Sequence, residues 1–405
     1  MISVHYFHGM LLSLAFGTIL LGGLAVVYRG GGQSVADALV TLTAFNTTFT
    51  FALICISVPL GALWLYWVSH GLEAGCFFAG LGLSAVVCFL LHFKGTEKTG
   101  LVLCLASNLL FVLFSIFFMS AFYDSSFDGR TYHQTSVYYL KNGWLPHKEQ
   151  LFIRWCNEYP KAPWIWEALV YRLGGSIEAG KSINCLAVYA LFNLAFYFSL
   201  RLRCSIIISR MFASLAVLNP VVITQFFSFY TDGLLYVFLA CIVLLASLLL
   251  HESPKNKRFL IGMLLLIIPF AANIKFTGMI YAYLVLGLAC VFAVAKRQKA
   301  SLRAIVGIGI LSLVLSIMVV GYNPYWTNVL QGKHLFHPLL GHRKIDIMTM
   351  NRPRYMNEHN PCYNFAASLL SRVSDNRDLR EPEWRNPLQL SAFREIKGTS
   401  KNSFF

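Results

Sequence analysis

Long apolar runs alternate with short polar segments along most of this chain of 405 residues. A helix that crosses a bilayer needs about 20 predominantly apolar residues, because the hydrocarbon core is about 30 Å thick. Ten runs approach that length: 10–28, 50–68, 74–93, 99–122, 182–200, 206–223, 232–250, 259–272, 277–295 and 303–321. The pattern predicts an all-α polytopic membrane protein with a bundle of about ten transmembrane helices.

Two apolar stretches depart from this simple pattern. The run 259–272 is short and contains Pro269, so we expect a broken or tilted helix there. The stretch 164–173, WIWEALVYRL, is too short to span, which favours an interfacial or re-entrant helix. It lies in the first of two long polar segments, 123–181 and 322–405.

The composition agrees with a membrane protein and excludes several other classes. Hydrophobic residues make up 57% of the chain and charged residues 13%, against about 45–50% and 25% in soluble domains. An ordinary soluble enzyme, a disordered protein and a coiled coil are excluded. The ten cysteines lie mostly in apolar runs without metal-ligand spacing. The first residues contain no Lys or Arg, which predicts a retained first helix instead of a cleaved signal peptide.

The formal net charge of +15 is explained mostly by topology. If the segment 123–181 is external, the short loops predicted to be cytoplasmic hold thirteen Lys and Arg residues. The short external loops then hold only Lys275, as the positive-inside rule requires. Both long polar segments fall on the external face, the periplasm of a bacterial inner membrane. No nucleic-acid partner is needed to account for the charge.

This topology divides the chain into three parts. Residues 1–95 form N-terminal transmembrane helices, and residues 96–321 form a core that includes the external loop 123–181. Residues 322–405 form an external polar C-terminal segment without a further apolar run of spanning length.

The first external loop contains the densest group of candidate residues. Asp124 and Asp128 stand four residues apart just after an apolar run. Such a pair can bind a divalent cation, Mg²⁺ or Mn²⁺, or one carboxylate can act as a general base. The alternative is a pair of solvated loop acids. Arg130, Tyr132 and His133 follow at once, so hydrogen-bond donors and a titratable imidazole favour a catalytic and substrate-binding loop.

Three further segments place charged residues at the same face. Asp232 begins an apolar run, where a carboxylate is costly unless it is paired or functional. Lys275 is suited to holding a lipid phosphate, although it can also extend to the headgroups. Lys333 and His337 belong to a basic stretch, 333–344, that suits either a phosphate clamp or contact with anionic lipid.

All these candidates lie on one predicted face, whereas the middles of the apolar runs are almost free of charge. A transporter usually places ionisable residues near the bilayer midplane. The arrangement instead favours chemistry on a phosphate-bearing substrate linked to a lipid.

Several segments together resemble the GT-C superfamily of integral-membrane glycosyltransferases. They are YDSSFDGRTYHQ with LKNGWLP, YPKAPWIWEALVYRLGG, FYTDGLLY, NIKFTG and NPYWTNVLQGKHLFHPLLG. The resemblance covers residues 99–341 and rests on the order and common sidedness of these motifs. It implies a GT-C-like helical bundle and a sugar donor carried on polyprenyl phosphate. The chain departs from that pattern because three or four helices, not one, precede the aspartate loop.

The resemblance also implies roles for individual residues. Asp128 best matches the loop aspartate that acts as base or metal ligand, and Asp124 is the second choice. Lys161 and Lys275 match positions that hold the donor phosphate, and Asp232 would face the sugar or the acceptor.

We therefore expect an inverting glycosyltransferase that acts at the external membrane face on a glycan, lipid or protein acceptor. One alternative is a flippase or transporter of lipid-linked sugars, which breaks no bond. The other is a glycan polymerase or ligase that uses polyprenyl-diphosphate donors, for which the stretch 333–344 would supply the stronger basic clamp.

Overall fold

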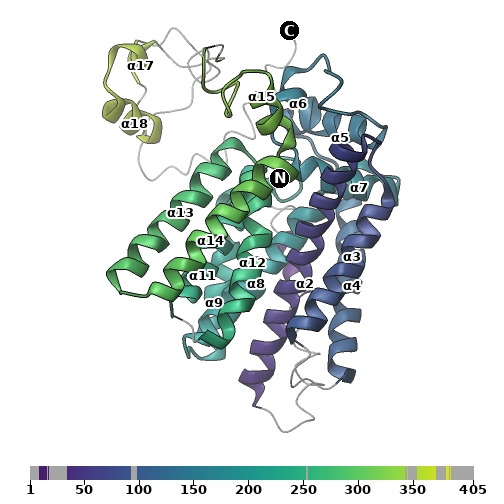
Figure 1. Ribbon diagram of the computed structural model, residues 1–405, viewed down its shortest axis with the longest axis vertical. Helices are drawn as coiled ribbons and strands as arrows, with labels where there is room; N and C mark the ends of the chain where they lie inside the picture. Colours follow the sequence, from purple (N-terminus) through teal and green to yellow (C-terminus); the bar gives the residue numbers. More distant parts are fainter. Residues whose placement is uncertain are drawn as a thin grey trace. The chain divides into compact units, whose positions relative to one another are not determined.

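The structure is a computed structural model that describes residues 9–15, 17, 34–92, 98–251, 254–342, 344, 354–370, 380–382 and 384. The chain forms two compact units, Met1–Gln331 and Gly332–Phe405. The first unit is a bundle of long helices with shorter helices at one end (Figure 1).

Long apolar helices dominate the first unit. Seven segments of the described chain are long and apolar enough to cross a membrane: Val35–Val68, Ala74–Leu91, Val102–Ser120, Ile177–Arg201, Asp232–His251, Phe276–Ala295 and Lys299–Val320. The helical, multi-pass class predicted from the apolar runs is therefore confirmed, with seven candidate spans among the described residues. The predicted span 10–28 lies mostly outside those residues.

The long helices have the following bounds: α2 Val35–Leu63, α3 Ala74–His92, α4 Lys98–Ser120, α8 Ser182–Arg201, α11 Asp232–His251, α12 Pro254–Ala272, α13 Phe276–Ala295 and α14 Lys299–Leu315. Short π-helical turns end α2 and α14, at η2 Trp64–Val68 and η5 Ser316–Val320. The predicted break in the run 259–272 is wrong, because α12 continues through Pro269.

The predicted single span at 206–223 is also wrong. The helix α9 (Ile206–Val217) ends after 12 residues, and α10 (Pro220–Gln225) starts after a break at Asn219. A residue before proline avoids helical dihedrals, and Asn219 is extended, with its side chain accepting from the Val221 N–H at 2.9 Å. The Tyr236 hydroxyl donates to the freed Ala216 carbonyl at 3.0 Å, so the break leaves this carbonyl satisfied.

Between α4 and α8 the chain forms a layer of short helices, seen at the upper end of the bundle in Figure 1. They are η3 Gly129–His133, α5 Gln134–Lys141, α6 Arg154–Glu158, α7 Ala162–Gly174 and η4 Ile177–Lys181. The first nine residues of α7 are all buried. Protein therefore encloses most of α7, and its interfacial or re-entrant placement stays a prediction.

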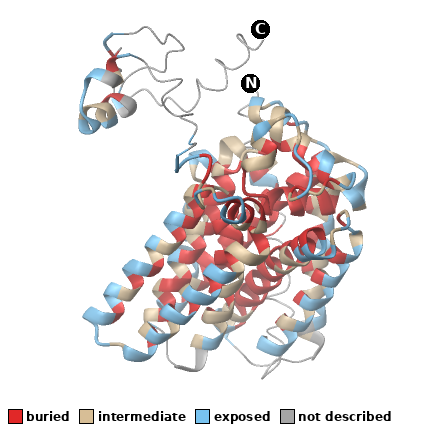
Figure 2. Ribbon diagram, turned by 45° about the horizontal axis from the view of Figure 1, so that its top comes forward, coloured by how far each residue is buried: buried red, intermediate tan, exposed pale blue. Residues whose placement is uncertain are grey.

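Burial follows the expected division between the inside and the outside of a membrane bundle. Buried residues concentrate where the helices of the first unit face one another (Figure 2). Large apolar side chains are exposed on outer helix faces, as with Leu90 of α3, Phe117 of α4 and Ile310 of α14. Such apolar outer faces suit lipid and would be unusual on a soluble monomer.

A chain of three buried asparagines joins α2, α4 and α8. Asn46 donates to the Asn193 side chain at 3.2 Å and accepts from the Asn108 side chain at 2.8 Å. Inside a bilayer such polar contacts hold helices together, because no water competes for them. The helix α2 is therefore joined to α4 and α8 of the core.

Asn46→Leu is expected to lower the free energy of unfolding by about 1–2 kcal/mol, the range of interhelical hydrogen bonds in membranes. The change leaves the Asn108 and Asn193 amides without their shared partner. Equilibrium unfolding in detergent micelles measures the effect, with Asn142→Leu at an exposed position as the control. Equal stability of the two variants would contradict this role.

Among the described residues of the second unit are two short helices, α17 Tyr355–Glu358 and α18 Pro361–Leu370. The Asn364 side chain ties them together by donating to the Met356 carbonyl at 2.8 Å. The first residues of the second unit form turns, in which the His337 N–H donates to the His334 carbonyl at 2.8 Å.

Candidate functional site

Three helix termini bring their charged residues together in the first unit. Asp232 is the first residue of α11, and Lys275 is the N-cap residue of α13. Their side chains form an ion pair, with 2.5 Å between Lys275 Nζ and Asp232 Oδ1. Both side chains remain partly exposed, at 33% for Lys275 and 43% for Asp232. This pair is therefore accessible to a ligand.

Asp128, at the N-cap of η3, belongs to the same centre. Its half-buried carboxyl group accepts a hydrogen bond from the Tyr132 hydroxyl at 3.5 Å. Burial raises the pKa of Asp128, while Tyr132 and then Lys275 oppose the shift and Asp232 adds to it. A carboxylate with a raised pKa is a stronger base, and its charge is still favoured by the nearby ammonium group. We call Asp128, Tyr132, Asp232 and Lys275 the acid–lysine centre.

His133 lies beneath this centre and is fully enclosed. Its Nδ1 accepts a hydrogen bond from the Trp164 indole N–H at 2.7 Å. Burial, with Lys275 as a second cause, lowers the pKa of His133 to about 3. Aromatic rings surround the imidazole: Tyr132, Tyr159, Trp164 and Tyr230. The enclosed imidazole is held by Trp164 and packs against Tyr132, and its predicted catalytic role stays a prediction.

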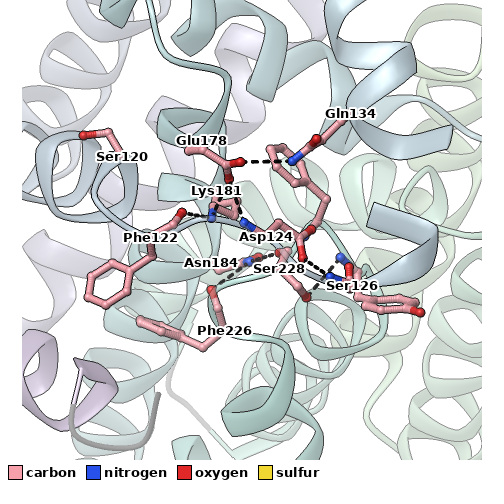
Figure 3. Close-up of polar contacts among 12 residues, drawn as sticks. Ser120, Phe122, Asp124, Ser126, Gln134, Glu178, Lys181, Asn184, Phe226 and Ser228 are labelled. Atoms are coloured by element: carbon pink, nitrogen blue, oxygen red, sulfur yellow. Dashed lines mark hydrogen bonds and ion pairs between the residues drawn. The ribbon is translucent and has the colours of Figure 1, made fainter. Parts of the chain in front are cut away.

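Asp124 is separated from the acid–lysine centre by its contacts. It is 1% exposed, and its two carboxylate oxygens accept from the backbone N–H groups of Ser126 and Phe229, both at 2.8 Å. Figure 3 shows this carboxylate inside a network of polar contacts. Each oxygen thus accepts from one backbone donor, and the predicted divalent cation stays a prediction. The described residues contain no group of three His, Cys, Asp or Glu side chains suited to a metal ion.

Lys161 is also buried, between α6 and α7. Its ammonium group donates to the carbonyls of Asn157 at 2.9 Å and Tyr159 at 2.8 Å. Burial lowers the pKa of Lys161 to about 7. The side chain thus caps the end of α6 and fixes the turn that carries Tyr159. These hydrogen bonds hold the ammonium group within the turn, and its predicted contact with a donor phosphate stays a prediction.

The remaining predicted site residues lie outside the acid–lysine centre as defined above, one in the first unit and two in the second. Arg130 is exposed, and its guanidinium group lies 5.7 Å from the centre of the Tyr123 ring. Lys333 and His337 belong to the second unit, where Lys333 is partly exposed and His337 is buried. Their predicted contact with substrate stays a prediction.

Sequence reasoning missed two kinds of residue at the site. Tyr159 is buried beside His133 and hydrogen-bonds with Thr231, the residue before Asp232. Glu178 and Lys181 form a buried ion pair, with 2.6 Å between Nζ and Oε2. Opposite charges three residues apart directly before an apolar run were the available signal for this pair.

Glu167 of α7 provides a test of the charge distribution beside Asp124. Burial raises the pKa of Glu167 well above its ordinary value of 4.5, with Asp124 adding to the shift and Lys181 opposing it. The folded protein therefore holds the neutral acid more tightly than the unfolded chain does. This contribution to stability is complete below about pH 4.5 and is lost as the pH rises toward the folded pKa.

Glu167→Gln, which cannot ionise, is expected to unfold at a higher temperature than the wild type at pH 8 and not at pH 4. Thermal unfolding in detergent at the two pH values measures this difference. Glu149→Gln, at an exposed position, is the control. The same advantage at both pH values would show that Glu167 is not held neutral.

Comparisons with protein-family models, curated protein sequences and solved structures found no match.

Proposed function

We propose that this chain is a membrane glycosyltransferase of the GT-C type, which transfers a sugar from polyprenyl phosphate to an acceptor hydroxyl. The observation that carries the proposal is the acid–lysine centre, in which a candidate base lies within electrostatic range of an accessible Lys–Asp pair. The reaction needs these two functions together, a group that accepts a proton and a cation that binds a leaving phosphate.

In the proposed reaction, the acceptor oxygen forms a bond to the anomeric carbon of the donor as the bond from that carbon to the phosphate oxygen breaks. The electron pair of the broken bond leaves with the polyprenyl phosphate. The hydroxyl proton passes to Asp128, and Lys275 neutralises the charge that develops on the phosphate. Attack on the face opposite the leaving group inverts the anomeric centre. Asp232 holds the Lys275 side chain at the N-terminus of α11 until the phosphate binds.

The location of the centre supports a substrate that resides in the membrane. Asp232 and Lys275 are at the ends of two candidate membrane spans, α11 and α13. A phosphate at the headgroup level can reach such residues while its polyprenyl chain stays among the lipids. With the orientation predicted from the basic residues, this level is the external, periplasmic face of a bacterial inner membrane.

A reconstitution experiment tests the proposal against its two alternatives. Purified protein in lipid vesicles is given a polyprenyl-phosphate donor with a labelled sugar, with and without EDTA. Free polyprenyl phosphate and labelled acceptor are the expected products, and a loss of both with EDTA would show that a metal ion takes part. Intact donor that appears in the opposite leaflet would instead identify a flippase. Cleavage of only a diphosphate-linked donor would identify the polymerase or ligase.

A further inference from the structure

Two segments far apart in the sequence carry the carboxylates of the acid–lysine centre. The segment 122–134 contains Asp128, and the segment 226–231 leads directly into Asp232. Figure 3 shows residues of both segments around the beginning of α8. The spacing of the two carboxylates therefore depends on how these segments are fastened to one another.

Asp124 makes the direct connection between the two segments. One carboxylate oxygen accepts from the Ser126 N–H, which closes a turn within the first segment, at 2.8 Å. The other accepts from the Phe229 N–H of the second segment, also at 2.8 Å. The side chain is 1% exposed. Charge-assisted hydrogen bonds shielded from water are among the stronger polar contacts in proteins.

The beginning of α8 and the preceding turn η4 hold the first segment. Glu178 accepts from the Asp124 N–H at 3.3 Å and from the Gln134 amide at 3.1 Å. Lys181 pairs with Glu178 and also donates to the Phe122 carbonyl. Residues 122, 124 and 134 are thus fixed to one short turn.

The same part of α8 holds the second segment. The Asn184 side-chain amide donates to the carbonyls of Phe226 at 3.1 Å and Ser228 at 2.9 Å. Both segments are therefore fastened to residues 178–184, and Asp124 closes the connection between them.

Gly129 shows how closely the first segment packs on Asp124. A Cβ atom at this position would lie 2.0 Å from Asp124 Oδ2 and 2.3 Å from Ser126 Oγ. Real Cβ atoms do not approach other atoms so closely, so any side chain at residue 129 must displace the carboxylate or the turn. Gly129 directly follows Asp128 in the chain, so a shift of this turn would also move the backbone of the candidate base.

We infer that Asp124 is a positioning residue, which sets the location of Asp128 relative to Asp232 and Lys275 by joining the segments 122–134 and 226–231. This inference rests on the proposed function for its catalytic consequence, whereas the connection itself can be measured without any activity. It gives Asp124 a role different from that of a base or a metal ligand.

The experiment compares Asp124→Asn and Gly129→Ala with the wild type and with Gly82→Ala. The asparagine keeps only one of the two side-chain oxygens that accept from backbone N–H groups, and the alanine pushes the carboxylate away without removing it. Gly82 is the matched control, since a Cβ atom there meets nothing within 4 Å. Hydrogen exchange of the backbone amides is measured by mass spectrometry, and donor turnover is measured over a range of pH.

Both variants are expected to exchange about tenfold faster in the segments 122–134 and 226–231, the effect of losing one hydrogen bond, with α8 and α11 unchanged. Turnover is expected to fall about 10²-fold, the cost of misplacing a reacting group by about 1 Å. The acid limb of the pH profile is expected to move to lower pH, because Asp128 loses part of the burial that raises its pKa.

Other outcomes would overturn the inference. Lost turnover without faster exchange would make Asp124 a base or ligand, and faster exchange throughout α8 and α11 with an unmoved pH profile would make it a general stabilising residue. Unchanged exchange and turnover would show that the connection does not matter. If even the wild type cleaves no donor, the proposed function fails, and the exchange result still decides whether Asp124 joins the two segments.

Discussion

Asp128→Asn is expected to lower the rate of sugar transfer by about 10²- to 10⁴-fold, the contribution typical of a general base. Asparagine keeps the shape of the side chain and an oxygen that can accept from Tyr132, but it cannot take up the acceptor proton. Burial is the largest influence on Asp128 and raises its pKa. As the pH is lowered, the wild-type rate is therefore expected to decline at a pH above 3.8, the ordinary pKa of this carboxyl group. Turnover of labelled donor in lipid vesicles measures both effects.

Glu149→Gln is the control for this prediction, because Glu149 is an exposed acid in the same layer of short helices and loops. It is expected to retain wild-type turnover and pH dependence. An Asp128→Asn protein that folds normally and transfers sugar at the wild-type rate would exclude Asp128 as the base.

Lys275→Met is expected to lower turnover by about 10²- to 10³-fold, as when a group that stabilises developing charge is removed from an active site. The variant also leaves Asp232 without its partner at 2.5 Å, so a carboxylate would face the incoming phosphate. Asp232→Asn keeps the cation and is expected to have a smaller effect. The double variant with both Lys275→Met and Asp232→Asn is expected to bind polyprenyl phosphate better than Lys275→Met alone, because it removes the repulsion between the Asp232 carboxylate and the phosphate.

Binding of polyprenyl phosphate in detergent micelles and turnover in vesicles separate these contributions. Lys148→Met, at an exposed position of the same layer, is the control for the lost positive charge. If Lys148→Met and Lys275→Met reduce binding equally, Lys275 acts only through the general charge of the surface.

The sequence was sufficient for the class of fold, because hydropathy depends on composition over about 20 residues and not on the exact contacts. The sequence was less reliable where a single residue decides whether the backbone stays helical. Asn219 and Pro220 end one helix and begin another inside the run 206–223, although the apolar pattern continues. Pro269 has the opposite outcome, since α12 passes through it.

The candidate site shows the same limit. The structure brings Asp128, Asp232 and Lys275 together, which their predicted location at one face of the membrane anticipated in part. The spacing of Asp124 and Asp128 could not separate their roles, since it contains no information about Phe229, which lies 105 residues away along the chain. Lys161 likewise appears in the sequence as a free cation, whereas its ammonium group donates to two carbonyls inside the protein.

An experimental structure of the protein in lipid nanodiscs with a non-cleavable polyprenyl-phosphate sugar bound tests the proposed role of the acid–lysine centre directly. We expect a phosphate oxygen to lie within hydrogen-bonding distance of Lys275 Nζ and the anomeric carbon to face Asp128. A phosphate bound only to the stretch 333–344, or at the opposite ends of α11 and α13, would contradict it.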